Sequence, residues 1–509
     1  MKWRVNFTIK NCNFNLIGKI VETFISYIPK KDGRQLFREW IFDYSDGTFI
    51  AYVPVDVIEE VTGWIRDKVI QNPEWADELH RECEKLNRDY YSFAKEILTK
   101  NIPALSNADL INLYSSLRRH QSESHGYAVS TTWFLESDGE IYSNYLRKKL
   151  DELLKNKGVQ DPYILAEYFT LLTSPTKENM AQEEQLDFLN LLKKIKSIQN
   201  AYNLFRQYEP GQEMFNLLPQ DIQAEINQYF NKWKWTPYGY TGPAYDLNYY
   251  LQLIKETLVN LSDIDAVIAE ETNRHPKLKK DQEELLVKLN MPAQLNHLFA
   301  VARDMIWLKD FRKYCIWHGH YVLDFLTKEI AKRLYITHKQ ANHFLPDEIG
   351  PALMNNTFDE HILNERIRHC AMRGTENGIE IFYGTEANKL IEGLDVEEVK
   401  VDVSEGWKGT TACPGEVEGA VKIVHSVEDI DKVEKGDIMI ALTTYPSFLP
   451  AMKRAAAIVT EDGGITCHAA IVAREFRIPC VVGAKKITQL LKDGEKIKVD
   501  ATRGTVKKI

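Results

Sequence analysis

The chain has 509 residues, 44% of them hydrophobic and 27% charged, which is typical of a globular protein with two to four domains. A net charge of -9 without a long basic block argues against nucleic acid as a partner. No run approaches the roughly twenty apolar residues of a transmembrane helix. The 7 cysteines are scattered without metal-type pair spacing, which suits a reducing compartment. From these two observations we expect a cytoplasmic protein with no membrane partner.

Residues 1–55 predict a small β-containing N-terminal segment. Strand-like alternation covers 2–9, 40–44 and 48–53, and the turn residues Ser45-Asp46-Gly47 separate the last two stretches.

Residues 56–335 predict a mainly α-helical region, because apolar residues recur at three- and four-residue spacings and glycines are few. The prolines at 103, 219 and 292 mark breaks between helices. We expect helices at 57–70, 73–100, 106–120, 140–157, 160–174, 178–209, 219–233, 245–272, 278–290 and 293–334.

The richest cluster of aromatic residues and glycines in the chain lies between two of these helices, at 233–247. A loop dense in Trp and Tyr can form the wall of a site for an apolar or ring-shaped ligand, with tyrosine hydroxyls to orient it. The alternative is that these rings pack between helices. The residues considered for acceptor binding are Trp235, Tyr238, Tyr240 and Tyr245.

A second cluster, Trp317-His318-Gly319-His320, carries two histidines two positions apart. On a helix this spacing directs the two rings to different faces, so shared metal ligation is not expected. We predict no metal site on the chain.

Residues 336–404 contain mixed polar signals and predict a connecting region and linker, with one strand at 399–403. Residues 405–509 alternate strand and helix patterns and predict a compact β/α domain. Strands are expected at 420–424, 438–441, 456–459, 480–482, 496–499 and 505–509, and helices at 426–433, 446–455, 467–476 and 487–492.

The most informative stretch is 460–474, where a buried strand, a tight Gly463-Gly464 loop and a helix follow one another. His468 falls at the loop-to-helix junction, where unpaired backbone N–H groups and the helix dipole favour an anion. A neutral imidazole is a nucleophile toward phosphorus, Thr466 adds a hydroxyl donor and Arg474 adds a cation. The alternative is a histidine that caps or packs the turn, and local physics alone leaves both open.

The segment 463–475, followed by Ile478-Pro479-Cys480-Val481-Val482-Gly483, closely resembles the phosphohistidine swivelling domain of the phosphoenolpyruvate-utilising enzymes. That family includes phosphoenolpyruvate synthase, pyruvate phosphate dikinase and rifampicin phosphotransferase. The flanking residues Pro414, Gly415, Gly419, Thr443, Pro446, Pro450, Met452 and Ala455 also match its pattern. The resemblance implies a C-terminal β/β/α domain in which His468 carries a phosphoryl or pyrophosphoryl group. It also implies that Thr466 corresponds to a threonine that some dikinases phosphorylate for regulation.

Family members obtain the phosphoryl group through an ATP-grasp domain or a TIM barrel, and this sequence predicts neither. Ahead of residue 400 there is no Gly-rich phosphate loop and no alternating β/α pattern. We therefore expect no cofactor on this chain, and we expect ATP and Mg²⁺ on a partner, an ATP-grasp protein or subunit.

The leading hypothesis is a phosphotransferase component, inactive without its partner, in which His468 passes the group to an acceptor bound by the helical region. The alternative is a non-catalytic ligand-binding or regulatory protein that retains the swivelling domain structurally. A third possibility is a donor site hidden in the N-terminal region. The sequence identifies neither the small-molecule acceptor nor the oligomeric state.

Overall fold

The computed structural model describes residues 1–9, 12, 14, 30–31, 34–35, 38–128, 137–261, 263–375, 377–397, 406–425, 427–444, 448–461, 463–464 and 467–509. These residues form a six-stranded sheet, a helical region and a C-terminal domain built on an eight-stranded sheet, besides a two-stranded ribbon of β2 (Lys30–Lys31) and β3 (Arg34–Gln35). Within the residues so described, no helix is both long and apolar enough to cross a membrane.

The six-stranded sheet has the order β7-β6-β4-β5-β1-β8. Adjacent strands of this sheet are antiparallel, except that β1 and β8 are parallel. The predicted hairpin joins β4 to β5, and Asp46 and Gly47 both have positive φ at its turn. The strands are β1 (Lys2–Ile9), β4 (Glu39–Ser45), β5 (Thr48–Pro54), β6 (His369–Thr375), β7 (Gly378–Tyr383) and β8 (Asp395–Val396).

This sheet corrects the prediction that residues 336–404 are a connecting region and linker. β6 pairs with β4 along its whole length, from His369 opposite Ser45 to Thr375 opposite Glu39. The N-terminal segment 1–55 is therefore one part of a sheet that β6, β7 and β8 complete. Pairing with β6 satisfies backbone hydrogen bonds of β4. The sequence of 369–383 does not indicate this pairing, because β4 lies far away in the chain. The helices here are α14 (His338–Ala341), η4 (Pro346–Glu348), α15 (Ile349–Asn355), α16 (Glu360–Arg368) and α17 (Gly384–Glu392).

The helical region packs around one long helix, α13 (Ala293–Leu334), which confirms the helix predicted at 293–334. Buried apolar residues lie on several faces of α13, as expected of a helix in the centre of a core. The helices that surround it are α2 (Val55–Gln71), α3 (Pro73–Ile97), η1 (Ile102–Ala104), α4 (Asn107–Ala128), α5 (Ser137–Asn156), α6 (Pro162–Thr173), α7 (Met180–Ser197), α8 (Gln199–Gln207), α9 (Gln212–Leu217), α10 (Gln220–Trp233), η3 (Thr236–Tyr238), α11 (Leu247–Asn260) and α12 (Ile264–Leu289).

The C-terminal domain contains an eight-stranded sheet of order β10-β14-β13-β12-β11-β15-β16-β9. β11, β12, β13 and β14 form its parallel centre. β12 and β13 are buried at every position, which explains why they read as short continuous apolar runs. The strands are β9 (Trp407–Lys408), β10 (Thr410–Cys413), β11 (Glu416–Ile423), β12 (Ile438–Ala441), β13 (Ala457–Thr460), β14 (Cys480–Val482), β15 (Lys496–Asp500) and β16 (Thr505–Lys508).

The strands predicted for this domain are confirmed within a few residues at their ends. Its helices are α18 (Leu449–Arg454), α19 (His468–Phe476) and α20 (Ile487–Leu490), and the segment predicted as a helix at 426–433 is the 3₁₀ helix η5 (Val427–Lys432). The strand predicted at 399–403 lies outside the described residues.

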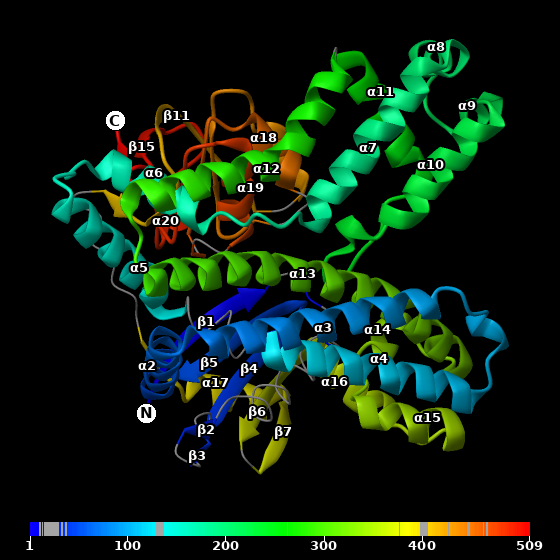
Figure 1. Ribbon diagram of the computed structural model, residues 1–509. Helices are drawn as coiled ribbons and strands as arrows, with labels where there is room; N and C mark the ends of the chain where they lie inside the picture. The colour runs from blue at the N-terminus through cyan, green and yellow to red at the C-terminus, as the bar shows by residue number, and fades with distance from the viewer. Residues whose placement is uncertain are drawn as a thin grey trace.

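The C-terminal domain docks on the helical region. Figure 1 shows it, orange to red, on the side of α13 opposite the six-stranded sheet. β10 contacts α6, and Ile471 of α19 packs against the core of the helical region. The Arg503 guanidinium carbon lies 5.9 Å from the centroid of the Tyr163 ring. This docking brings the start of α19 toward the middle of α13.

Candidate active site

His468 is the first residue of α19, directly after the glycine loop that follows β13. Gly463 has φ of 112°, and a Cβ atom there would come within 2.9 Å of the Cβ and Sγ atoms of Cys467. The Gly464 carbonyl accepts a hydrogen bond from the Cys467 N–H at 2.9 Å. Both glycines therefore shape the turn that brings His468 to the helix start. Their predicted phosphate contacts stay a prediction.

The first turn of α19 offers backbone donors to an anion. Cys467 is the N-cap residue and makes no side-chain cap hydrogen bond to these N–H groups. The first N–H groups of a helix lack partners within the helix, and the dipole adds partial positive charge at the same end. A phosphoryl group on His468 is compatible with this position.

The hydroxyl of Thr444 orients the His468 ring. Thr444 Oγ1 lies 2.8 Å from His468 Nδ1, and both residues are buried. When Nδ1 carries the proton and donates it to Oγ1, Nε2 keeps its lone pair. Sequence analysis missed Thr444. The available signal was its place after β12, the parallel neighbour of β13, because the carboxyl ends of such strands share one edge of a sheet.

Lys313, on α13 of the helical region, lies close to the start of α19. Burial, and then the positive charge of Lys313, hold the pKa of His468 well below its usual range. Burial also lowers the pKa of Lys313, against the opposing charge of Asp310. The Lys313 Nζ lies 5.7 Å from the centroid of the Trp317 ring. His468 is therefore neutral near pH 7, which is the form that attacks phosphorus.

Asp310 lies one helical turn from Lys313 and is 6% exposed. Burial raises the pKa of its carboxyl to about 6, although Lys313 opposes the rise. A carboxyl whose pKa lies near the working pH is suited to accept a proton during a reaction. Sequence analysis assigned no role to Asp310 or Lys313, because a charge on a long helix does not reveal what it faces.

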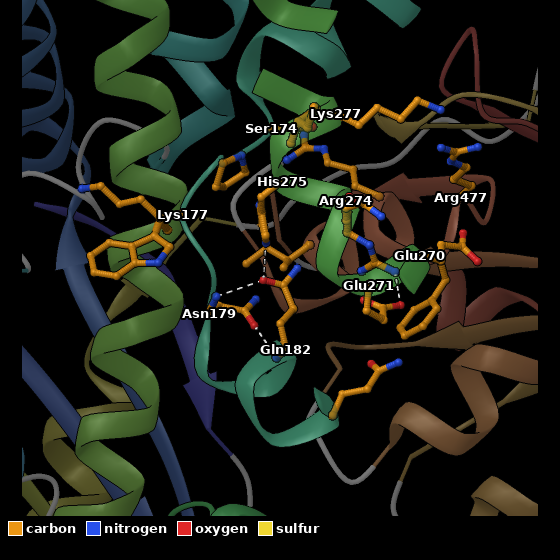
Figure 2. A pocket seen from close by; sticks show the side chains of 18 of the residues that line it. Ser174, Lys177, Asn179, Gln182, Glu270, Glu271, Arg274, His275, Lys277 and Arg477 are labelled. Carbon is orange, nitrogen blue, oxygen red and sulfur yellow. Dashed lines mark hydrogen bonds and ion pairs between the residues drawn. The ribbon is translucent and has the colours of Figure 1, made fainter. Parts of the chain in front are cut away.

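A cavity of about 720 Å³ lies beside these residues. Its walls come from α12, from α13, from α19 and from the start of α7 with the segment before it (Figure 2). Asp310 and Ile471 line it, each one helical turn from Lys313 and His468, respectively. The cavity therefore borders both helices close to these two residues, although neither Lys313 nor His468 lines it.

Of the two side chains predicted to help bind phosphate, the structure describes Arg474 but not Thr466. Arg474 lies further along α19, where its Nε donates to the Ala412 carbonyl of β10 at 3.0 Å and its side chain lines the cavity. Arg474 thus lines the cavity, whereas His468 does not, and the phosphate-binding role of Arg474 stays a prediction. Thr466, predicted for phosphate binding and regulation, lies outside the described residues.

The four aromatic residues predicted for acceptor binding fall into two pairs. Trp235, 2% exposed, packs edge-on against Tyr314, and Tyr238 packs edge-on against Tyr321, so an acceptor reaches little of either ring. Tyr240 and Tyr245 are partly exposed. Tyr240 lies 6.3 Å from Trp317, ring centroid to centroid, whereas Tyr245 packs on Tyr249 at 4.0 Å. Tyr240 thus packs on Trp317, whose ring centroid lies 5.7 Å from Lys313 Nζ. The acceptor role stays a prediction.

His318 and His320 make separate contacts on α13. The His318 ring lies 4.6 Å from the Tyr91 ring, centroid to centroid, and His320 Nε2 lies 3.2 Å from Gln121 Nε2. Burial lowers the pKa of both histidines to about 3. Over the ranges given above, no group of three or more His, Cys, Asp or Glu side chains is arranged to hold a metal ion.

Comparison with known proteins assigns the C-terminal domain. Residues 433–504 match the family model described as PEP-utilising enzyme, mobile domain. The chain therefore carries a mobile domain of the phosphoenolpyruvate-utilising enzymes, with His468 at the start of its helix α19.

Phosphoenolpyruvate synthases are among the similar curated proteins. A probable synthase of Archaeoglobus fulgidus is 50% identical over 118 residues, which are 23% of this chain and 16% of that protein. The enzyme of Pyrococcus furiosus is 51% identical over 117 residues, 23% of this chain and 14% of that protein. The enzyme of Escherichia coli is 46% identical over 86 residues, 17% of this chain and 11% of that protein. The chain thus spans less than a fifth of the length of these relatives.

The similarity to solved structures is weak. A solution structure of a UPF0107 protein covers 20% of this chain and 98% of its own chain, with a TM-score of 0.18 and 17% identity. A holo-form aconitase X of Thermococcus kodakaraensis covers 20% of this chain and 97% of its own, with a TM-score of 0.17 and 23% identity. Scores this low support no conclusion about the fold.

Proposed function

We propose that the chain is a phosphotransferase component in which His468 carries a phosphoryl or pyrophosphoryl group to an acceptor bound by the helical region. The observation that carries the proposal is the neutral His468 ring, hydrogen bonded to Thr444 and docked near Lys313 of the helical region. The relatives named phosphoenolpyruvate synthase support phosphoryl transfer as the class of reaction.

In the loading step, Nε2 of His468 attacks the phosphorus atom of the donor. An N–P bond forms while the bond from phosphorus to the donor's leaving oxygen breaks, and the electron pair departs with that oxygen. Nδ1–H stays hydrogen bonded to Thr444 Oγ1, so the ring keeps its orientation. Backbone N–H groups in the first turn of α19 donate to the phosphoryl oxygens.

In the transfer step, an acceptor hydroxyl attacks the same phosphorus atom. An O–P bond forms, the N–P bond breaks and its electron pair returns to Nε2. The Asp310 carboxylate accepts the hydroxyl proton, and Lys313 balances negative charge on the phosphoryl oxygens. Asp310 is buried and Lys313 is partly buried, which supports these roles, because charges act more strongly away from water.

The proposed donor is a separate ATP-grasp protein, which binds ATP and Mg²⁺ and loads His468 when the C-terminal domain leaves its docked position. The chain is then inactive without that partner. If the isolated chain instead acquired label from ATP, the donor site would belong to the chain itself.

The decisive experiment is phosphorylation of the full chain by the candidate partner with γ- and β-labelled ATP. We expect acid-labile, alkali-stable label on the wild type and none on His468→Ala. His425→Ala, which changes an exposed histidine in the same domain, is the matched control and labels normally. Label that persists in His468→Ala refutes the proposal.

A non-catalytic ligand-binding or regulatory protein is the second candidate, and the 720 Å³ cavity favours it equally. That function requires ligand binding that His468→Ala leaves unchanged, together with no phosphorylation by any donor. Phosphorylation of His468 excludes it.

A further inference from the structure

The cavity has walls from two parts of the chain that move independently under the proposed function. Figure 2 shows Lys177 and Asn179 of the helical region on one side and Arg477, at the end of α19, on the other. Ile471 and Phe476 of α19 also line it. The cavity is therefore complete only while the C-terminal domain is docked.

One buried donor in the cavity wall has no protein partner. Arg274 of α12 forms an ion pair through Nη2 with Glu271 Oε1 at 2.5 Å. Its Nη1 is buried without a hydrogen-bond partner. A guanidinium binds a carboxylate or phosphate best through two parallel N–H donors, and a buried donor left unpaired is costly. Because Arg274 also lines the cavity, an acidic group on a ligand bound there lies beside its guanidinium.

The rest of the wall mixes apolar, neutral polar and charged side chains, with the cations Lys177, Lys277, Arg474 and Arg477 beside acidic residues of α12 and α13. Ile306 and Trp307 of α13 and Ile471 of α19 present apolar surface, while Gln182 and Asn273 offer amide groups. The volume of about 720 Å³ fits the range of about 300–1,000 Å³ for sites that hold drug-sized organic molecules. The wall therefore suits an amphiphilic ligand with an apolar body and an acidic group.

Asp310 is the cavity-lining residue of α13 that is nearest in sequence to Lys313. It lines the wall, it is buried, and it lies one helical turn from Lys313, which lowers the pKa of His468. A ligand hydroxyl at Asp310 thus lies one helical turn along α13 from the cation that acts on His468.

We propose that this cavity binds the acceptor, that the acceptor is a drug-sized alcohol or phenol with an acidic substituent, and that its binding holds the C-terminal domain docked. The inference rests on the proposed function only in calling the ligand an acceptor. Docking follows from linkage: a ligand that contacts both walls binds the docked state more tightly, so it shifts the population toward that state.

The first test uses 8-anilinonaphthalene-1-sulfonate, which joins an aromatic body to an acidic group, and follows its fluorescence on titration into the full chain. We expect one saturable site. Ala269→Trp, at a lining position of α12, fills the cavity and weakens binding at least tenfold. Ala266→Trp, on the same helix outside the cavity, is the matched control and binds as the wild type does. Equal affinity in both variants overturns the proposal.

The second test separates the acidic-group contact from general apolar binding. Arg274→Gln weakens binding of the sulfonate at least tenfold, but it weakens binding of the uncharged N-phenyl-1-naphthylamine less than threefold. Arg206→Gln, an exposed change on α8, leaves both affinities unchanged. An equal loss for both probes in Arg274→Gln overturns the assignment of an acidic ligand.

The third test addresses docking. Lys453 of α18 lies outside the cavity and near Glu184 and Glu271 of the helical region, whose pKa values burial raises while Lys453 opposes the rise. Lys453→Glu places a third negative charge there and undocks the C-terminal domain. We expect sulfonate affinity to fall at least tenfold, with Lys435→Glu, an exposed change in the same domain, as the unaffected control. Unchanged affinity in Lys453→Glu overturns the coupling.

None of these assays requires phosphoryl transfer. If His468 is never phosphorylated but the cavity binds as described, the proposed function fails and the binding site stands. If His468 is phosphorylated but cavity variants bind and transfer as the wild type does, the acceptor assignment fails alone.

Discussion

The C-terminal domain and the helical region meet at His468, and each contributes a different kind of group. On the side of the C-terminal domain stand a neutral imidazole, the Thr444 hydroxyl and the backbone N–H groups of α19. On the side of α13 stand two ionisable side chains, the buried Asp310 and the partly buried Lys313.

This difference separates the two halves of the proposed reaction. The groups that hold the phosphoryl carrier move with the C-terminal domain and are present in both steps. The charged groups stay with the helical region and act only when the domain is docked. Variants on α13 should therefore impair transfer and spare loading, whereas variants around His468 should impair both.

Asp310→Asn should cause the largest effect that is confined to one step. Loss of a general base lowers transfer by about 10²–10⁴-fold, while loading by the partner stays within about threefold of the wild type because Asp310 is not near the carrier when the domain is undocked. Measurement follows label from prephosphorylated chain into the small-molecule fraction. If the loading rate and the transfer rate fall by the same factor, Asp310 does not act in the transfer step alone.

The pH profile tests the same carboxyl in the wild type. Asp310 has its pKa raised to about 6, so it is ionised above that pH and protonated below it. The transfer rate should rise about tenfold per pH unit below pH 6 and level off above pH 7. Asp310→Asn should show no such inflection.

The raised pKa also predicts a stability effect with a definite sign. Raising the pKa from its ordinary value of 3.8 to about 6 corresponds to about 3 kcal/mol, which the fold loses as pH rises through this interval, because the folded state binds the extra proton. Denaturant unfolding at pH 4 and pH 7 should show a larger loss in the wild type than in Asp310→Asn. Equal losses contradict the buried state of the carboxyl.

Lys313→Met should slow transfer by about 10²–10³-fold, because removal of this cation leaves the negative charge of the phosphoryl oxygens unbalanced. It should also raise the pKa of His468, since Lys313 is the charge that opposes protonation of the ring. The readouts are the transfer assay and an NMR titration of the His468 ring. Lys332→Met, an exposed change on α13, is the control and alters neither.

Thr444→Val should lower loading by about fivefold, because the hydrogen bond that orients the ring is worth about 1 kcal/mol. Thr444→Ser keeps the hydroxyl and should restore most of the loading rate. Nitrogen chemical shifts of the imidazole report the tautomer directly. A Ser variant as slow as the Val variant would show that the hydroxyl does not act through His468.

Gly463→Ala should give the smallest change, a loss of about 1–3 kcal/mol in stability, because its Cβ meets Cys467 and its φ is positive. Gly436→Ala also carries positive φ but has open space around its Cβ, so it measures backbone strain alone. The difference between the two variants isolates the loop contact. Urea unfolding of both chains provides the comparison.

Sequence analysis recovered those parts of the protein that local patterns encode. The Gly-Gly loop and His468 are contiguous, so their turn is set by neighbouring residues. β12 and β13 are buried on both faces, and apolar residues surround α13, so each gives a clear pattern over its own length. Thr444 could have been found from its place at the end of β12, but the hydrogen bond to His468 joins segments from two strands.

Only the tertiary structure could pair β6 with β4, bring Lys313 to the start of α19, and form the cavity from helices far apart in the chain. It also placed Trp235 and Tyr238 in the core, although their cluster had suggested a ligand wall. A sequence pattern reports the polarity of one segment and the side it buries. It carries no information on which distant segment covers that side, because that choice depends on the packing of the whole chain.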